Sequence, residues 1–173
     1  MSARLTAPHP LADALRTAFR GHPGGVAVAT ARSGSGPVGL TLSSVASVSV
    51  DPPAVVLSVN NGSPAAEGLL AAPSFLVHLL DARHARLARL FATPGADKFG
   101  APVAWTSLDT GEPRLDDVGT VLRCTPLELV RVGASTVVVG QVHQVHTGHA
   151  DADPMVHVRR RFHRVTDEAV LPE

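Results

Sequence analysis

Residues 36–59, GPVGLTLSSVASVSVDPPAVVLSV, contain two β-rich runs separated by a Pro-Pro pair at 52–53. In an extended chain, alternate side chains point to opposite faces, so hydroxyls and packing methyls separate here. The residues Thr41, Ser43, Ser47 and Ser49 share one parity, and Leu40, Leu42 and Ser44 share the other. The segment predicts a strand pair whose polar face suits a phosphorylated, flat, partly apolar ligand, although the solvated face of a half-buried strand has the same pattern.

The composition indicates one globular domain over residues 1–173, with a core at about 10–165 and flexible termini. Hydrophobic residues make up 45% of the chain and charged residues 17%. Fifteen basic residues balance fifteen acidic ones. This balance argues against nucleic acid as a partner, because binding to a phosphate backbone draws on a basic excess.

The single cysteine, Cys124, excludes a disulfide within the chain and suits a reducing cytoplasm. We see no N-terminal apolar stretch typical of a secretory signal, and no run of 18 apolar residues. We therefore expect a cytoplasmic protein without a membrane span.

Hydrophobic periodicity and turn residues predict a mainly β fold with flanking helices. Helices are expected at 10–20, at 64–71 with Ser63 as the N-cap, and at 82–91 with Asp81 as the cap. Strands are expected at 26–31, 38–44, 47–50, 54–59, 74–80, 118–130, 136–147 and 155–165. Long neighbouring strands with short turns favour an antiparallel sheet closed into a barrel with helices outside.

The order of several short motifs resembles the flavin reductase family, which has the FMN-binding split-barrel fold. Beside 36–59, these are GGVAVAT at 24–30, Ser63, FLVHLL at 75–80, Asp97-Lys98-Phe99, Trp105, and Leu122 with Cys124. The resemblance covers about residues 15–163. It implies an antiparallel split β-barrel that uses NAD(P)H to reduce FMN or FAD, forms a homodimer and supplies a partner monooxygenase with reduced flavin.

A flavin phosphate requires convergent donors or a cation, because an unpaired charge at a partly buried site is costly. Hydroxyls in 41–44, the Ser63 hydroxyl and the helix that Ser63 caps can supply such donors. With the resemblance, the predicted cofactor-binding residues are Thr41, Leu42, Ser43, Ser44, Val45, Ser47, Ser63, Lys98, Phe99 and Arg159. No catalytic acid or base is assigned, since the cofactor carries the hydride chemistry.

The chain departs from the family pattern in three places. Gly133-Ala134-Ser135 stands where many relatives carry Gly-Asp-His, and Ser43 replaces the usual Asn. In MVHVRRRFH at 155–163, Arg159 aligns with a family arginine, whereas Arg160 takes a usual glycine position and needs a partner, a bulge or a ligand phosphate. Two alternatives stay open: a flavin enzyme acting directly on a small organic substrate, and a non-catalytic flavin-binding subunit.

Other candidate sites are weaker. The spacing of His143, His146 and His149 suggests a metal site, but His143 and His146 lie three residues apart and so on opposite faces of a strand. No Cys or paired carboxylate accompanies them in a recognisable ligand spacing, so we expect no metal site. Cys124 is interpreted as a buried packing thiol. Asp116 and Asp117 are interpreted as a solvated turn.

Overall fold

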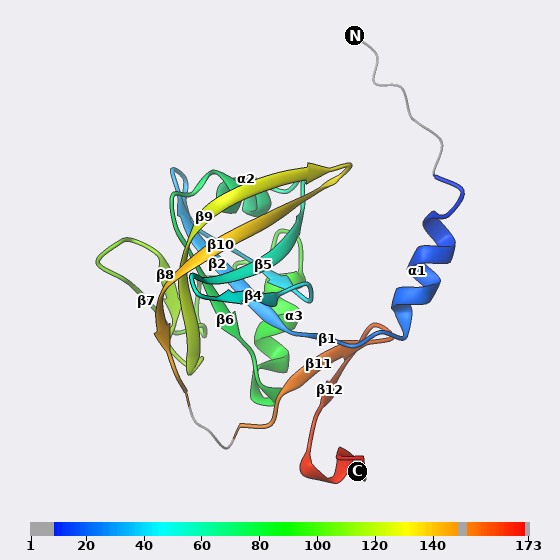
Figure 1. The fold of residues 1–173 in the computed structure, drawn as a ribbon. Coiled ribbons are helices and arrows are strands. Elements are labelled where there is room, and N and C mark those ends of the chain that lie inside the picture. Colours follow the sequence, from blue (N-terminus) through cyan, green and yellow to red (C-terminus); the bar gives the residue numbers. More distant parts are fainter. Residues whose placement is uncertain (1–8, 149–151, 172–173) are drawn as a thin grey trace.

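The computed structural model describes residues 9–148 and 152–171, and a seven-stranded antiparallel sheet forms its body (Figure 1). The strand order is β3-β2-β6-β9-β10-β5-β4. The strands are β2 (Ala27–Ser33), β3 (Gly36–Leu42), β4 (Ala46–Val50), β5 (Pro53–Asn60), β6 (Phe75–Leu79), β9 (Thr120–Val132) and β10 (Ser135–His146). The predicted mainly β, antiparallel fold is confirmed. The extreme termini predicted as flexible, and His149, lie outside the described residues.

The sheet curls because its two edge strands are consecutive in the chain. β3 and β4 are at opposite ends of the strand order, yet only residues 43–45 separate them. Such a link can span at most about 14 Å, so the two edges must approach each other. The Ser44 side chain sits at this closure, hydrogen-bonded to the backbone of Ser58 on β5. The segment 36–59 therefore joins the two edges of an open, split barrel.

Two hydrophobic clusters use the two faces of β2. Ala27, Ala29 and Ala31 belong to a cluster with Phe75 and with Leu69 of α2 (Pro64–Ala71). Val28 points the other way and belongs to a second cluster with Phe91 of α3 (Ala85–Ala92). The period-two alternation of the strand thus places one helix over each cluster.

The N-termini of these helices follow the predicted caps. Ser63 accepts a hydrogen bond from the N–H of Ala66 at 3.1 Å, with Pro64 as the first helical residue. Asp81 caps a 3-10 turn, η1 (Ala82–His84), which leads into α3. The helix predicted from 82 therefore begins as a 3-10 turn. The predicted N-terminal helix is α1 (Ala12–Arg20), and a further 3-10 turn, η2, spans Asp167–Ala169.

The prediction of a single strand at 155–165 is wrong, because two strands joined by a turn occupy this region. The chain forms a hairpin of β11 (Met155–Val158) and β12 (Arg161–Arg164), which pairs with the short β1 (Gly24–Gly25). The turn consists of Arg159 and Arg160, whose φ angles are 49° and 64°. Two consecutive left-handed residues make the turn that hairpins favour, but its usual residues are Asn and Gly. The two arginines therefore do not indicate in the sequence that the chain turns back on itself here.

A second small sheet, β7 (Trp105–Ser107) with β8 (Pro113–Leu115), lies in a region predicted to be a loop. Buried polar groups attach it to the barrel. His78 Nδ1 donates to the Val28 carbonyl and Nε2 accepts from the Leu115 N–H, each at 3.1 Å. Burial lowers the pKa of His78 to about 4, so this linking imidazole is neutral.

Glu112 is a buried carboxylate beside β8, and Arg123 of β9 donates to it from Nε at 2.8 Å. Burial acts to raise the pKa of Glu112, but hydrogen bonds from Ser74 and Thr110, together with the charge of Arg123, hold it below its usual value. The pair joins the 108–112 loop to the barrel wall.

Cys124 is fully buried in the first cluster, and burial raises its thiol pKa to about 12. Its predicted packing role is confirmed. Among the described helices, none is long and apolar enough to cross a membrane.

Candidate functional site

A cavity of about 970 Å³ opens between β3, the N-terminus of α2, and the segment that follows α3. Its volume is in the range of pockets that hold cofactors and drug-sized ligands. Seven of the ten predicted residues line it: Thr41, Leu42, Ser43, Ser44, Ser63, Lys98 and Phe99. Residues more than fifty positions apart in the chain thus meet at one site.

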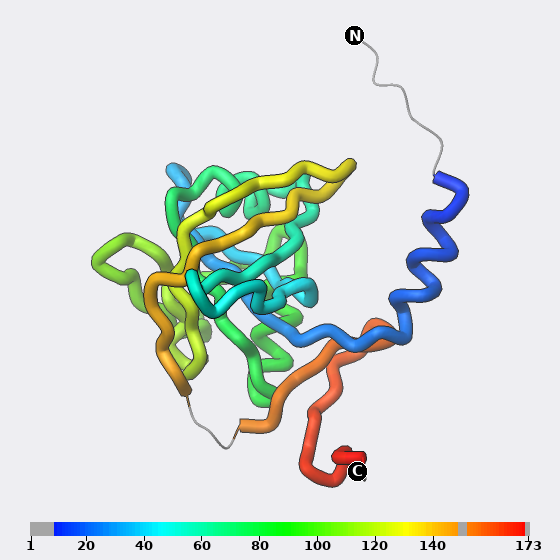
Figure 2. The backbone as a smooth tube through the Cα atoms, in the orientation of Figure 1, coloured from blue at the N-terminus to red at the C-terminus, as the bar shows by residue number. Residues whose placement is uncertain are grey.

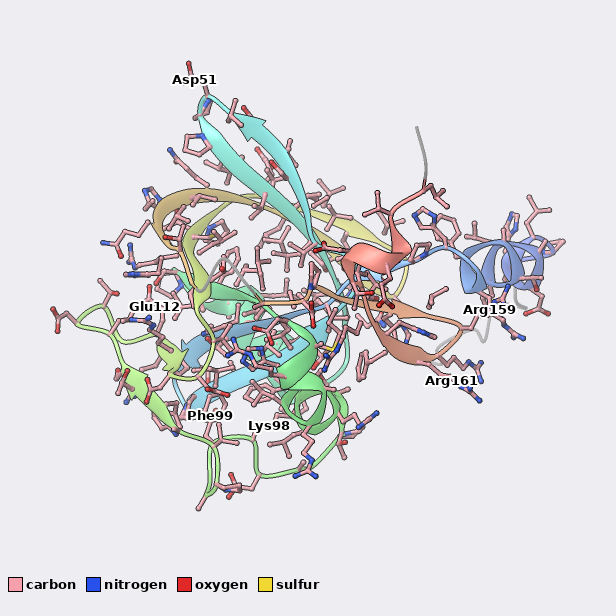
Figure 3. All side chains as sticks on the ribbon, turned by 90° about the horizontal axis from the view of Figure 1, so that it is seen from below. Asp51, Lys98, Phe99, Glu112, Arg159 and Arg161 are labelled. Atoms are coloured by element: carbon pink, nitrogen blue, oxygen red, sulfur yellow. The ribbon has the colours of Figure 1, made fainter. Side chains whose placement is uncertain are left out.

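Three predicted residues lie elsewhere. Val45 immediately precedes β4 and Ser47 is the second residue of that strand, and neither lines the cavity. Arg159 lies in the β11–β12 turn, where its N–H donates to the carbonyl of Arg20 at 3.0 Å. Figure 3 shows Arg159 well separated from Lys98 and Phe99. Within one chain, Arg159 does not reach this cavity.

The hydroxyls of Thr41 and Ser44 are engaged within the protein. Thr41 Oγ1 donates to the Ala88 carbonyl of α3 at 2.7 Å. Ser44 Oγ donates to the Ser58 carbonyl and accepts from the Ser58 N–H, both at 3.0 Å. A hydroxyl has one proton, so neither side chain has a donor left for a ligand. The expectation that both donate to a phosphate is corrected: they hold the cavity wall in place.

The other two hydroxyls differ. Ser63 uses its oxygen as an acceptor for the N–H of Ala66, which leaves its proton for a ligand. Ser43 is exposed and also lines the cavity. The first N–H groups of α2 have no partners within the helix, and its N-terminus carries a partial positive charge. This corner of the cavity can therefore receive an anion.

Lys98 brings a cation to the cavity wall. Its Nζ donates to the Gly39 carbonyl at 3.1 Å, so the half-buried side chain lies against β3. Burial lowers the pKa of Lys98 from its ordinary value. Burial thus disfavours the charged form of Lys98, and an anion in the cavity would stabilise that form.

Asn61 is a site residue that the sequence analysis missed. Its Oδ1 accepts a hydrogen bond from Thr136 Oγ1 at 2.9 Å, which orients the amide. Its Nδ2 is buried and has no partner among the described residues, although the residue lines the cavity. An unpartnered buried donor is costly, and a ligand acceptor in the cavity would satisfy it.

The remaining wall is lined by Phe91 and Phe99, and Trp105 packs against Phe99 outside the lining. Phe91, Phe99 and Trp105 follow each other edge to face, with ring centroids 5.4 Å apart in both pairs. The Trp105 indole N–H donates to the Phe99 carbonyl at 2.8 Å. This hydrogen bond ties Trp105 to the backbone of Phe99, the residue after Lys98. Gly39 is required opposite Phe91, because a Cβ there would lie 2.6 Å from Phe91 Cε1. The cavity thus combines an apolar, aromatic wall with donors suited to an anion.

The predicted absence of a metal site concerns residues outside the cavity. His143 Nε2 shares a hydrogen bond of 2.8 Å with Thr125 Oγ1, and His149 lies outside the described residues. Between residues 9–148 and 152–171, no cluster of three or more His, Cys, Asp or Glu side chains could hold a metal.

Comparison with known proteins identifies relatives over most of the chain. The family model described as "Flavin reductase like domain" matches residues 19–166. An NADH:FMN oxidoreductase from Rhodococcus qingshengii is 38% identical over 154 residues, which cover 87% of this chain and 80% of that protein. The reductase component of a 4-nitrophenol 4-monooxygenase/4-nitrocatechol 2-monooxygenase from Rhodococcus opacus is 34% identical, covering 80% of this chain and 72% of that protein.

Solved structures agree with these relatives. The Streptomyces globisporus NADH:FAD oxidoreductase, in complex with NAD and FAD fragments, superimposes with a TM-score of 0.82 at 31% identity. The match covers 95% of this chain and 99% of that chain. The predicted split-barrel fold is confirmed, and the chain belongs to the flavin reductase like domain family.

Proposed function

We propose that the protein is an NAD(P)H-dependent flavin reductase that supplies reduced FMN or FAD to a partner monooxygenase. The observation that carries the proposal is the cavity, in which the unpartnered amide of Asn61, the Lys98 cation and the start of α2 converge beside an aromatic wall. The names of the relatives, an NADH:FMN oxidoreductase and a monooxygenase reductase component, support it. The lone cysteine is consistent with work in a reducing cytoplasm.

The cavity fits a flavin nucleotide. The Nδ2 donor of Asn61 lacks an acceptor among the described residues, and a phosphate or ribityl oxygen would supply one. We assign the phosphate to Ser63, the first turn of α2 and Lys98, and the ring to the wall formed by Phe99 and 42–44. Thr41 and Ser44 position this wall, and Val45 and Ser47 extend it toward the flavin edge.

The chemistry required of the protein is mainly positioning. A bound flavin supplies a hydride acceptor and passes the electrons onward. The residues of the chain bind and orient the ligand and exclude water on the aromatic side of the cavity. No side-chain acid or base is assigned to the reaction.

The test measures NADH and NADPH oxidation by the purified protein with added FMN or FAD, together with flavin affinity by calorimetry. We expect flavin-dependent oxidation at rates typical of enzymes, from about 1 to 1,000 per second. Tight flavin binding without oxidation of either nucleotide would reject the reductase in favour of a flavin-binding subunit. Absence of flavin binding would reject every flavin function considered above.

We further propose that the protein is a homodimer in which α1 packs against the second copy. Leu11, Leu15 and Phe19 form one stripe along this helix and are exposed by 66%, 60% and 64% in the single chain. No residue of α1 is buried, and the helix projects away from the barrel (Figures 1 and 2). A contiguous exposed apolar stripe is typical of a surface that another protein surface covers. A second copy would also offer its Arg159, whose N–H is hydrogen-bonded to the carbonyl of Arg20 at the end of α1, to a neighbouring cavity.

Replacement of both Leu15 and Phe19 by Glu should convert the dimer to monomer, because burial of two carboxylates in an apolar contact is costly. Sedimentation velocity measures the change. Thr17→Glu, on another face of the same helix, is the control and should stay dimeric. A wild-type protein that sediments as a monomer at micromolar concentration would contradict the proposal.

A further inference from the structure

A second, basic pocket of about 440 Å³ lies beside the β11–β12 hairpin and is separate from the cavity described above. Its lining residues are Arg89, His157, Arg160, Arg161 and Phe162. Arg89 comes from α3, and the others come from the hairpin. Arg89 and Ala92, which lines the first cavity, are one turn apart on α3. In Figure 3, α3 lies between Lys98 and Arg161, so the two pockets flank one helix.

The charge of this pocket is uncompensated. Three guanidinium groups line it and no carboxylate does. Across the described part of the chain, Arg89, Arg160 and Arg161 form no ion pair with Asp or Glu, whereas Arg164 of the same hairpin pairs with Asp153 at 3.2 Å. The whole protein has zero formal charge, so this cluster is a local feature rather than a consequence of composition. Guanidinium groups bind phosphate oxygens with two parallel hydrogen bonds.

The pocket also offers flat surfaces. The Arg89 guanidinium carbon lies 5.7 Å from the centre of the Phe162 ring. The His157 and Phe162 rings are 5.4 Å apart at an interplanar angle of 58°. Aromatic rings and guanidinium planes are the groups on which nucleobases stack. The pocket therefore suits a ligand that carries both phosphate and a planar base.

The backbone at Arg160 favours a functional role for its side chain. Its φ of 64° is a conformation that Gly adopts without strain and that arginine adopts at a cost. An arginine in this position suits folding less well than glycine would. A ligand contact made by the guanidinium explains its presence.

We propose that this pocket binds the adenosine diphosphate half of a dinucleotide, as a subsite beside the flavin cavity. The inference rests on the reductase function proposed above, because NAD(P)H and FAD both carry this half. It assigns the phosphates to Arg160 and Arg161 and the adenine to the surface formed by Arg89, His157 and Phe162. FMN lacks the adenosine diphosphate half and does not use this pocket.

The test compares Arg160→Gly and Arg161→Gln with wild type. Arg160→Gly suits the turn conformation, so loss of binding in that variant is not loss of folding. Arg86→Gln, which removes an exposed arginine of α3 outside the pocket, is the matched control. Calorimetry measures the affinities of ADP, FAD and FMN. Kinetics measure KM for NADH, NADPH and reduced nicotinamide mononucleotide, which has no adenosine half.

We expect ADP affinity to fall about tenfold in each pocket variant, because a charge-assisted hydrogen bond is worth roughly 1.4 kcal/mol or more. FMN affinity and the KM for reduced nicotinamide mononucleotide should not change. If the affinity for FAD falls with that for ADP while KM for NADH and NADPH is unchanged, the ligand of the pocket is the adenosine half of FAD. If KM for NADH or NADPH rises while the affinity for FAD is unchanged, the ligand is the adenosine half of the nicotinamide nucleotide.

ADP that fails to bind wild type, or binds all variants equally, overturns the subsite even if FMN binds and NADH is oxidised. A pocket whose variants lose only transfer of reduced flavin to an oxygenase would be a protein-docking surface, which also overturns it. Failure of the reductase proposal appears separately, as absence of FMN binding in wild type and in the Arg86→Gln control.

Discussion

Ser63→Asp should weaken FMN binding by about 100-fold while the protein remains folded. Aspartate is as good an N-cap as serine, so the hydrogen bond from the Ala66 N–H can be kept. The new carboxylate would stand where we assign the phosphate. Two unit charges about 4 Å apart repel by about 4 kcal/mol at an effective dielectric constant of 20, and solvent at this open cavity reduces that figure. Calorimetric titration with FMN measures the loss.

Two controls isolate the charge. Ser63→Asn is a neutral N-cap of nearly the same shape as Asp, so it should lose only the hydroxyl contact, about tenfold or less. Riboflavin lacks the phosphate and should bind the Asp and Asn variants alike. If Ser63→Asp binds FMN as well as Ser63→Asn does, the phosphate does not lie at the start of α2.

Gly140→Ala should destabilise the protein by about 3 kcal/mol, the upper part of the range for overpacked cores. Gly140 lies in β10 next to a register shift against β9, and a Cβ there would lie 2.7 Å from Cζ of Phe75. Phe75 is only 1% exposed and belongs to the first core cluster, so its ring has little space to move. Urea unfolding followed by circular dichroism measures the change in unfolding free energy.

A double-mutant cycle tests the stated cause. Phe75→Leu removes the ring atom that the new methyl would meet, so the double variant should be more stable than the sum of the single effects predicts. Gly25→Ala is the control, because its Cβ would meet no atom within 4 Å. It should change stability by less than about 0.5 kcal/mol. Strict additivity of Gly140→Ala and Phe75→Leu would show that the contact is not the reason for the loss.

The sequence was sufficient to predict the barrel strands and the helix caps, because each is determined by a few neighbouring residues. The alternation in 36–44, the Pro-Pro pair at 52–53 and the Ser63-Pro64 cap each act over a few residues. The β11–β12 turn was not predicted, also because the prediction used local signals. Arg159 and Arg160 adopt the left-handed conformation, but in the sequence two arginines look like the middle of a strand. The hairpin that contains them pairs with β1, more than a hundred residues away in the chain, and a local sequence pattern does not record this pairing.

The candidate site was predictable as a region but not in its hydrogen bonds. The hydroxyl pattern indicated the cavity wall, and seven of the ten predicted residues line the cavity. The Thr41 hydroxyl donates its proton to a carbonyl of α3, 47 residues away in the chain. The Ser44 hydroxyl donates its proton to a carbonyl of β5. Asn61 before Gly62 has the sequence of an ordinary turn, and only the structure shows that Thr136 holds its Oδ1 while its Nδ2 is left without a partner among the described residues.

Trp105 gives the protein a spectroscopic property of its own. The chain has one tryptophan and no tyrosine, so its near-ultraviolet emission comes from a single indole. That indole is held against Phe99, which lines the flavin cavity, by a ring contact and by a hydrogen bond to its carbonyl. A bound oxidised flavin would accept excitation energy from it at short range. Quenching of this one fluorophore would report occupancy of the cavity without any attached label.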